Sequence, residues 1–172
     1  MSLPMKILAC LVPVWGLVSC AGYQLGDIKP ASLTQVKSIA VPMFVNTTLH
    51  PRAEALATSA VANALVLDGT YRLAGPDKAD AVLKGELHSI KYAPIRNTRL
   101  DTLHPEELSN TVTLHWSLRD AKDLTKILAS GTSTGSSELY VADNLQTARN
   151  SSLPDALERA AQNLVSILAN SY

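Results

Sequence analysis

The chain has 172 residues with 15 Lys or Arg and 15 Asp or Glu, so its formal net charge is zero. A chain of this length is expected to form one domain with an ordinary hydrophobic core. Nucleic-acid binding is not expected, because it requires a clear excess of basic residues.

An apolar run, Ile7–Val18, follows Lys6 at the start of the chain. The run is too short to cross a bilayer, which needs about 20 apolar residues, and Pro13 and Gly16 would weaken a helix there. Its length and position are typical of a signal peptide, with a buried N-terminal helix as the alternative. We therefore expect residues 1–19 to be removed from the mature protein.

The segment Leu17-Val18-Ser19-Cys20 resembles the lipobox of bacterial lipoproteins. The resemblance implies that the Cys20 sulfur carries a diacylglyceryl group and that its amino group is acylated after cleavage. Two or more acyl chains anchor a protein firmly to a membrane. Ala21 resembles an outer-membrane address, because Asp at that position retains such lipoproteins at the inner membrane. The other cysteine, Cys10, lies in the removed segment, so the mature chain cannot form an internal disulfide.

Residues 20–35 contain glycines and a proline and are predicted to form a lipidated tether. The next segment, 36–46, is predicted to be a strand with Ile39, Val41 and Met43 on one face. Pro42 removes one backbone donor, which favours an edge strand or an irregular strand end.

A helix is predicted within residues 46–73, with Pro51 in its first turn and Gly69 just after its end. The apolar residues recur at helical spacing and are rich in alanine, so this helix is expected to lie close to a sheet. The stripe comprises Ala53, Leu56, Ala57, Ala60, Val61, Ala64 and Leu65.

Three strands are predicted next, at 79–95, 111–119 and 124–138. The first is expected to contain a bulge near Gly85, because its apolar residues change phase. The second alternates strictly between apolar and polar residues, so one face should meet the core and the other should be polar. Residues 96–110 are predicted to be a polar loop in which Glu106 and Glu107 form a solvated pair.

The last helix is predicted within residues 151–171, with Ser152 and Asp155 as a variant capping box and Pro154 in the first turn. The element order β-α-β-β-β-α predicts an α/β (α+β) fold. We expect a two-layer sandwich over residues 36–172, with two helices on one face of a mixed four-stranded sheet.

Catalytic and metal motifs are not expected to function in this chain. Residues 131–135 match G-x-S-x-G, but no helix is predicted after Ser133, and all four histidines precede it. No two histidines are spaced i, i+4 and the mature chain has no free thiol, so a zinc site is not expected. His88 and His115 are interpreted as strand residues on polar faces. No phosphate-binding loop is present, and we predict neither a cofactor nor an enzymatic activity.

Basic residues gather at the end of the strand at 79–95 and after it. Of these, Lys91, Arg96 and Arg99 are candidate phosphate contacts, because arginines near a strand tip can bind phosphates bidentately. A solvated basic loop is the alternative interpretation.

Several blocks of the sequence resemble the lipopolysaccharide-assembly lipoprotein (LptE) family. They are "CAGYQLG" after the lipobox, "VKSIAVPMFVNTT", "HPRAEALATSAVANALVLDGTYRLAG" and "KADAVLKGEL", and they span about half of the chain. The resemblance implies a small α/β sandwich that sits inside a large outer-membrane β-barrel, the D component of the Lpt system, as its plug and assembly partner. It also implies binding of lipopolysaccharide and delivery to the outer leaflet, which would make lipopolysaccharide phosphates the ligands of Lys91, Arg96 and Arg99.

Two other classes stay open at this point. One is a lipid-anchored structural or ligand-binding envelope lipoprotein without a dedicated barrel partner. The other is a lipid or ester hydrolase that uses Ser133, which the missing helix and the order of the histidines disfavour.

Overall fold

The computed structural model describes residues 30, 33–97, 105–140 and 144–170, without the side chains of residues 96, 97, 105 and 106. The signal peptide and Cys20 therefore lie outside the described residues. Leu33 packs in the hydrophobic core and is 1% exposed.

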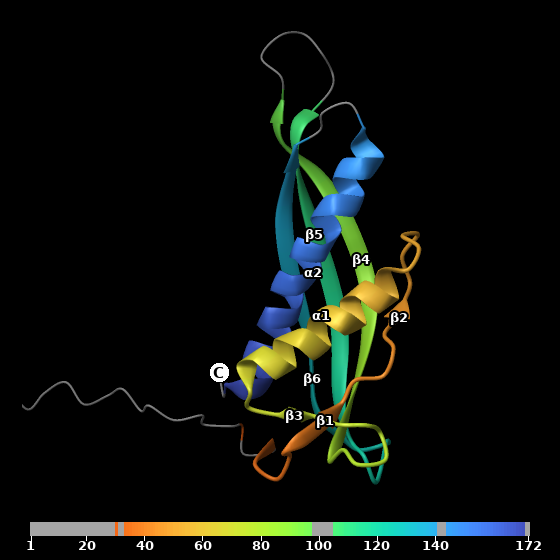
Figure 1. Ribbon diagram of the computed structural model, residues 1–172, viewed down its shortest axis with the longest axis vertical. Coiled ribbons are helices and arrows are strands. Elements are labelled where there is room, and N and C mark those ends of the chain that lie inside the picture. The colour runs from red at the N-terminus through yellow and green to blue at the C-terminus, as the bar shows by residue number, and fades with distance from the viewer. Residues whose placement is uncertain (1–29, 31–32, 98–104, 141–143, 171–172) are drawn as a thin grey trace, which may run out of the picture.

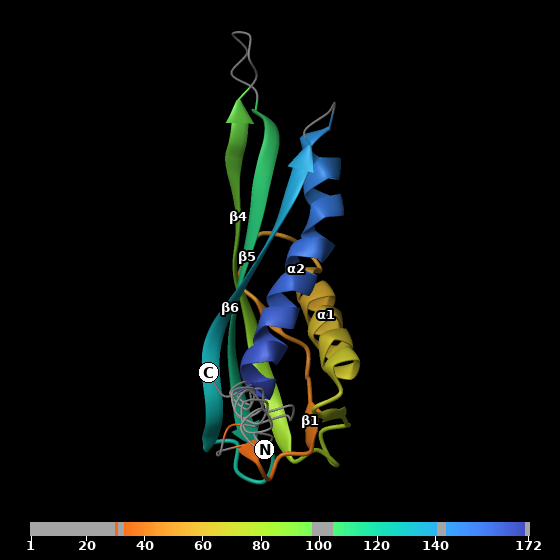
Figure 2. The ribbon, with the colours of Figure 1, turned by 90° about the vertical axis from the view of Figure 1, so that its left-hand side faces the viewer.

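The protein is an elongated two-layer sandwich with both helices on one face of a single sheet (Figures 1 and 2). This arrangement confirms the predicted α+β fold. Within the described residues, no helix is long and apolar enough to span a membrane. The elements are β1 (Ser38–Ala40), β2 (Val45–Asn46), α1 (Ala53–Asp68), β3 (Arg72–Leu73), β4 (Ala81–Asn97), β5 (Pro105–Asp120), β6 (Ile127–Tyr140) and α2 (Leu145–Ala169).

The sheet has the strand order β3-β1-β4-β5-β6, and β2 adds to β4 beside β1. Strands β1, β2 and β3 make parallel pairs, whereas β4, β5 and β6 form a long antiparallel meander. Helix α1 lies in the connection that brings the chain from β1 back to the parallel strand β4. The sheet is therefore mixed, as predicted.

The sheet has six strands where four were predicted, because the first predicted strand divides and β3 adds another. The chain leaves the sheet after Ala40, passes Pro42 and returns as β2, which agrees with the irregularity expected from the proline. The apolar face predicted for residues 36–46 is wrong at Met43, which is 63% exposed. The neighbouring Phe44 is buried instead. Phe44 packs directly over Gly85, where a side chain would collide with the phenyl ring.

The hairpin of β4 and β5 is longer than predicted, and most of the expected 96–110 loop is strand. Glu107 is not a solvated loop residue but a strand residue that is 8% exposed and pairs with Arg96 in the ladder. Polar residues do not prevent pairing here: Asn110 lies on the helical face, where its Nδ2 donates to Ser152 Oγ of α2 at 3.4 Å. The predicted bulge exists, but it lies between Leu87 and Ser89 rather than at Gly85.

Helix α2 begins at Leu145, six residues before the predicted segment, so the expected cap at Ser152 and Asp155 is wrong. Asn144 caps the helix instead, because its side chain accepts hydrogen bonds from the backbone N–H groups of residues 146 and 147. Pro154 therefore lies inside the helix. Beside it, Ser137 Oγ donates to the Ser152 carbonyl over 2.7 Å, which anchors this part of α2 on β6.

The core lies between the sheet and the helices and is mainly aliphatic, as expected. The alternation predicted for residues 111–119 is confirmed, with Val112, Leu114 and Leu118 fully buried. The G-x-S-x-G segment is a stretch of β6 that passes under α2. Ser133 is 3% exposed, and its hydroxyl accepts a hydrogen bond from Trp116 Nε1 at 2.9 Å. It therefore lies within a strand and not at a strand-to-helix turn.

The outer edge of β6 is covered by polar side chains from α2. Arg159 Nη1 donates to the Ser136 carbonyl at 2.9 Å, and Asn163 Nδ2 donates to the Thr134 carbonyl at 2.7 Å. These contacts satisfy edge carbonyls that would otherwise be free to pair with another strand.

Tyr71 joins the segment after α1 to the C-terminal end of α2, and its ionisation is expected to loosen this contact. Its hydroxyl donates to the Leu168 carbonyl over 2.8 Å, and burial, aided by the charge of Asp68, raises the pKa of Tyr71 from 10.0 to about 12. Because this pKa is raised, the stabilisation is complete below pH 10 and is lost as the pH rises towards 12. Urea unfolding of Tyr71→Phe should show about 1 kcal/mol lower stability at pH 7 and a smaller loss between pH 9 and 11. An equal pH dependence in both proteins would contradict this role.

Candidate functional site

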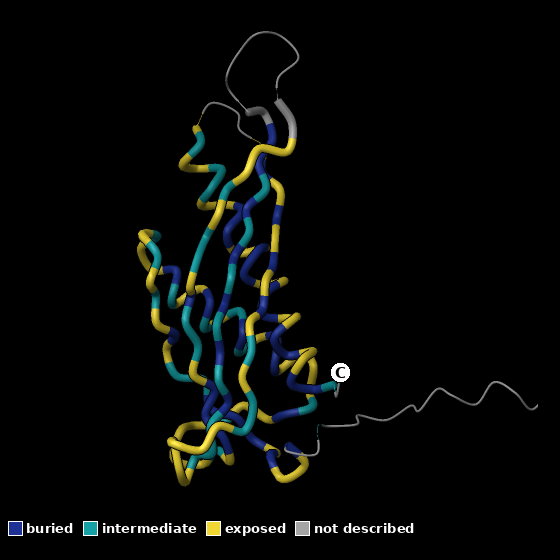
Figure 3. The backbone as a smooth tube through the Cα atoms, turned by 180° about the vertical axis from the view of Figure 1, so that it is seen from behind, coloured by how far each residue is buried: buried dark blue, intermediate teal, exposed yellow. Residues whose placement is uncertain are grey.

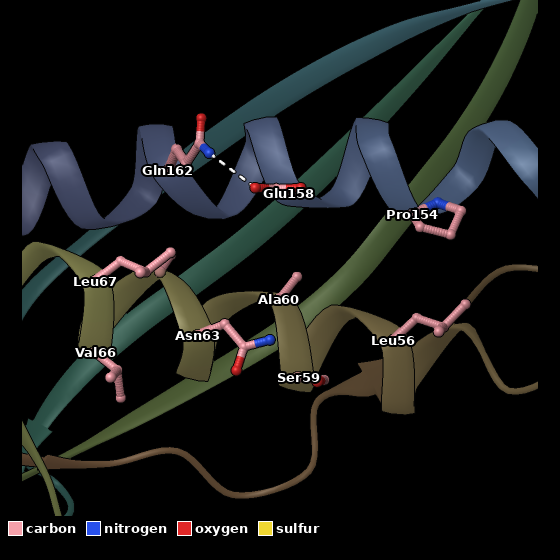
Figure 4. Close-up of a pocket in the computed structure, with 10 residues that line it drawn as sticks. Leu56, Ser59, Ala60, Asn63, Val66, Leu67, Pro154, Glu158 and Gln162 are labelled. Atoms are coloured by element: carbon pink, nitrogen blue, oxygen red, sulfur yellow. Dashed lines mark hydrogen bonds between the residues drawn. The ribbon is translucent and has the colours of Figure 1, made fainter.

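A surface trough runs along the helical side of the protein and consists of two connected parts. The first, the cleft, has a volume of about 660 Å³ and lies between the start of α1, β4 and the first turns of α2. The second, the groove, has a volume of about 440 Å³ and lies between α1 and α2 (Figure 4). Leu56 lines both parts. The cleft is lined by Thr48, Leu49, His50, Pro51, Arg52, Ala55, Leu56, Ile90, Tyr92, Gln146, Arg149 and Asn150.

The side chain of Asn46 shapes the loop that forms one wall of the cleft. Its Oδ1 accepts hydrogen bonds from the backbone N–H and hydroxyl of Thr48, at 2.9 and 2.8 Å. Its Nδ2 donates to the His50 carbonyl at 2.8 Å and to Glu54 Oε2 at 2.9 Å. A backbone hydrogen bond within Glu54, followed by this bond from Asn46, lowers the pKa of Glu54. The asparagine thus ties the loop to the first turn of α1.

Arg52 occupies the turn immediately before α1 with φ 63°, in the left-handed region. Such a conformation costs about 1–2 kcal/mol for a residue with a side chain, and it is often retained at functional positions. His50 Nε2 lies 3.2 Å from Asn150 Oδ1, which links the same loop to α2. This contact places the loop against α2, and Arg52 is an exposed residue of the cleft lining.

Arg149 supplies the second guanidinium of the cleft. Its guanidinium carbon lies 4.7 Å from the ring centroid of Tyr92, a cation–π arrangement. Burial raises the pKa of Tyr92, and the charge of Arg149 opposes that increase. Among the described residues, Arg149 Nε and the Tyr92 hydroxyl are buried atoms that lack a hydrogen-bond partner. Buried polar atoms of this kind are normally satisfied, so these two atoms are candidates for a polar partner other than the described residues.

The groove continues the cleft with a mainly apolar lining. Figure 4 shows Leu56 and Ala60 of α1 facing Pro154 of α2. Leu67 lies further along and is 80% exposed, which is unusual for a leucine beside a groove. Glu158 is the one charged residue of the groove lining, and it accepts a hydrogen bond from Gln162 at 3.2 Å.

The opposite face of the sheet carries no helix (Figure 3). The side chains that alternate with the buried Val112 and Leu114 onto this face are mainly polar. Lys91 is exposed on this open face, opposite Thr111 on β5. Arg96 belongs to β4, but its side chain is outside the described part of the chain, as are Arg99 and Cys20 altogether. His88 and His115 lie on the open face, as interpreted from the sequence.

The cleft was not predicted from the sequence. The predicted start of α2 left Arg149 in an undefined segment, and nothing in the sequence places that segment beside residues 48–52. The cleft contains two arginines and a histidine and no carboxylate, whereas the groove is mostly apolar. Together they suit a ligand with an anionic head and an apolar tail.

Solved structures share this fold. The chain is similar to PelC from Paraburkholderia phytofirmans, solved as a dodecamer, with 21% identity and a TM-score of 0.54 over 84% of this chain and 94% of that one. It is similar to protein XCC0632 from Xanthomonas campestris, with 16% identity and a TM-score of 0.57 over 84% and 88% of the two chains. At such identities the likeness shows the fold alone. A comparison with curated protein sequences found no match.

Residues 36–169 match the family described as LptE, lipopolysaccharide-assembly. The match contains every helix and strand of the structure, including the loop and the helix turns that form the cleft. It covers most of the chain, so the chain belongs to the LptE lipopolysaccharide-assembly family.

Proposed function

We propose that this protein is an outer-membrane lipoprotein that acts as the plug and assembly partner of the β-barrel of the lipopolysaccharide-transport system, the Lpt D component. In this role it binds lipopolysaccharide and helps deliver it to the outer leaflet. It is attached to the membrane through lipid on Cys20 and lies at the periplasmic face or in the barrel lumen. The mechanism is binding, with no bond made or broken, and no cofactor is required. The family match over residues 36–169 is the observation that carries this proposal.

The trough supports the lipopolysaccharide part of the proposal. Lipopolysaccharide combines phosphate groups with acyl chains. Arg52 and Arg149 are positioned to contact a phosphate, and the groove from Leu56 to Leu67 to receive part of an acyl chain. Lys91, Arg96 and Arg99 are a second proposed set of phosphate contacts, on the β4–β5 hairpin.

Co-purification tests the barrel partnership. The full-length protein, tagged at its C-terminus, is extracted from outer membranes in mild detergent and captured. We expect a large β-barrel protein to be recovered in one-to-one ratio, because a plug occupies one barrel. A tagged lipoprotein from the same membrane, with a different fold, serves as the control. Recovery of the protein without any barrel would reject the plug proposal.

Depletion of the protein separates the two envelope functions. Loss of lipopolysaccharide from the cell surface would support the transport role. Normal surface lipopolysaccharide together with a loosened envelope would instead support a structural lipoprotein that has no barrel partner.

Replacing Cys20 tests the anchor. Cys20→Ala removes the sulfur that receives the diacylglyceryl group, and each buried methylene of that group contributes about 0.8 kcal/mol of membrane affinity. We expect the variant to leave the membrane fraction or to be mislocalised, with the unfolding transition of its sandwich unchanged. Cys10→Ala is the matched control, because that cysteine lies in the segment expected to be removed. A Cys20→Ala protein that stays in the outer-membrane fraction would contradict lipidation at this position.

A further inference from the structure

Three side chains with metal-binding atoms meet on the open face of the sheet, remote from the trough. Glu86 on β4 and His115 on β5 are direct partners in the antiparallel ladder. His88 follows two residues after Glu86, at the point where the ladder shifts register between Leu87 and Ser89. Bulges of this kind redirect a side chain, and here His88 is brought over His115.

The geometry of the cluster is compact. The imidazole rings of His88 and His115 are stacked, with centroids 4.2 Å apart and an interplanar angle of 18°. His88 Nδ1 lies 3.5 Å from Glu86 Oε1. One ligand atom from each of the three residues lies within 4.8 Å of the other two. The side chains of His88 and Glu86 are 52% and 41% exposed, so an ion can reach them from solvent.

We propose that Glu86, His88 and His115 form a binding site for a divalent transition-metal ion of the zinc class. Two imidazole nitrogens and one carboxylate oxygen are a common set of protein ligands for Zn²⁺, which then keeps one position open for water or another ligand. Calcium and magnesium are excluded as preferred ions, because they favour sites made of oxygen atoms alone.

Binding requires the two stacked rings to turn, because an ion lies in the plane of each imidazole that binds it and two nearly parallel ring planes cannot both contain one ion. Zinc lies about 2.0–2.1 Å from each nitrogen, which sets ligand atoms roughly 3.3 Å apart in a tetrahedral site. The atoms of the cluster therefore approach by no more than about 1.5 Å, within reach of torsion changes in half-exposed side chains. Thr47 Oγ1 lies 3.3 Å from Glu86 Oε1 and is placed to orient the carboxylate, as outer hydrogen bonds do in metal sites. The ion would join β4 to β5 where the ladder is interrupted.

Zinc titration of the full-length, untagged protein in detergent tests the proposal. We expect calorimetry to show one Zn²⁺ per chain. His88→Gln and His115→Gln should each weaken binding by at least about tenfold, since even outer-shell changes cost 10–100-fold. His50→Gln is the control for loss of an imidazole elsewhere, and its affinity for Zn²⁺ should equal that of the parent.

A spectroscopic measurement distinguishes ligands from residues that only stabilise the strands. With Cu²⁺ in place of Zn²⁺, electron paramagnetic resonance should show two coordinated imidazole nitrogens in the parent and one in each single variant. Circular dichroism without metal confirms that each variant is folded. Equal Zn²⁺ affinity in the parent and in the His88→Gln, His115→Gln double variant would show that the cluster is a ring stack and not a metal site.

Discussion

Gly135→Ala is expected to lower the free energy of unfolding by about 3 kcal/mol or more, at the upper end of the usual cost of overpacking a core. Helix α2 crosses β6 at Gly135 so closely that an added Cβ would lie 2.2 Å from both Ala156 O and Ala160 N. These are backbone atoms, so no rotation of a side chain can make room. The helix has to move away from the sheet, which opens voids in the core on both sides of the contact.

Urea unfolding followed by circular dichroism measures the effect, with Gly75→Ala as the matched control. A Cβ at Gly75 would meet nothing within 4 Å, so this variant should be neutral or more stable by about 0.4–1 kcal/mol, through the lower entropy of its unfolded chain. If Gly135→Ala loses less than about 1 kcal/mol, then α2 does not rest on the backbone of β6 as the structure shows.

The small-residue segment around Gly135 shows what could be predicted from the sequence. The strand predicted at 124–138, which contains Gly135, is confirmed as β6. The apolar stripe of α1 was also predicted, because burial follows helical spacing at Ala57, Val61 and Leu65. Leu56 belongs to the same stripe but is 41% exposed. It lines both parts of the trough, so the departure from the pattern coincides with the candidate site.

Other features depend on contacts between distant segments, which local patterns do not record. Phe44 is buried because Gly85 leaves space for its ring, although the two residues lie far apart in the chain. The pairing of His88 with His115 depends on a bulge and on strand register, and neither can be read from histidine spacing. Pro154 was interpreted as a helix start because proline favours the first turn, but the cap of Asn144 starts the helix earlier.

Removing both arginines of the cleft is expected to weaken lipopolysaccharide binding by about a hundredfold. A hydrogen bond to a charged group contributes about 1.5–3 kcal/mol, so each guanidinium that contacts a phosphate accounts for about tenfold or more. The variant is Arg52→Gln with Arg149→Gln. Glutamine at position 52 retains the backbone cost of the left-handed conformation, so the change removes charge and not backbone strain. Binding is measured on the full-length protein in detergent.

Two further variants of the same protein locate the phosphate contacts. Lys91→Gln, Arg96→Gln and Arg99→Gln together remove the second proposed set, on the β4–β5 hairpin. Lys78→Gln with Lys122→Gln is the control, because both lysines are exposed in turns next to the Ala81–Asp120 end of the hairpin, far along the ladder from Tyr92. Each variant is tested with lipopolysaccharide and with the same lipid after its phosphates have been removed.

The dephosphorylated lipid makes the result specific. If the cleft binds phosphate, the parent should prefer the phosphorylated lipid, and the Arg52, Arg149 variant should lose that preference while it keeps its affinity for the dephosphorylated lipid through the apolar groove. If only the hairpin variant loses the preference for phosphorylated lipid, the phosphates bind at the hairpin, and the proposal that the cleft binds phosphate is contradicted. If both variants bind like the control, neither set contacts phosphate. Because salt screens exposed charges, the parent's preference for the phosphorylated lipid should also fall between 0.05 and 0.5 M NaCl. The contribution of exposed Arg52 to this preference should fall by more than the contribution of half-buried Arg149.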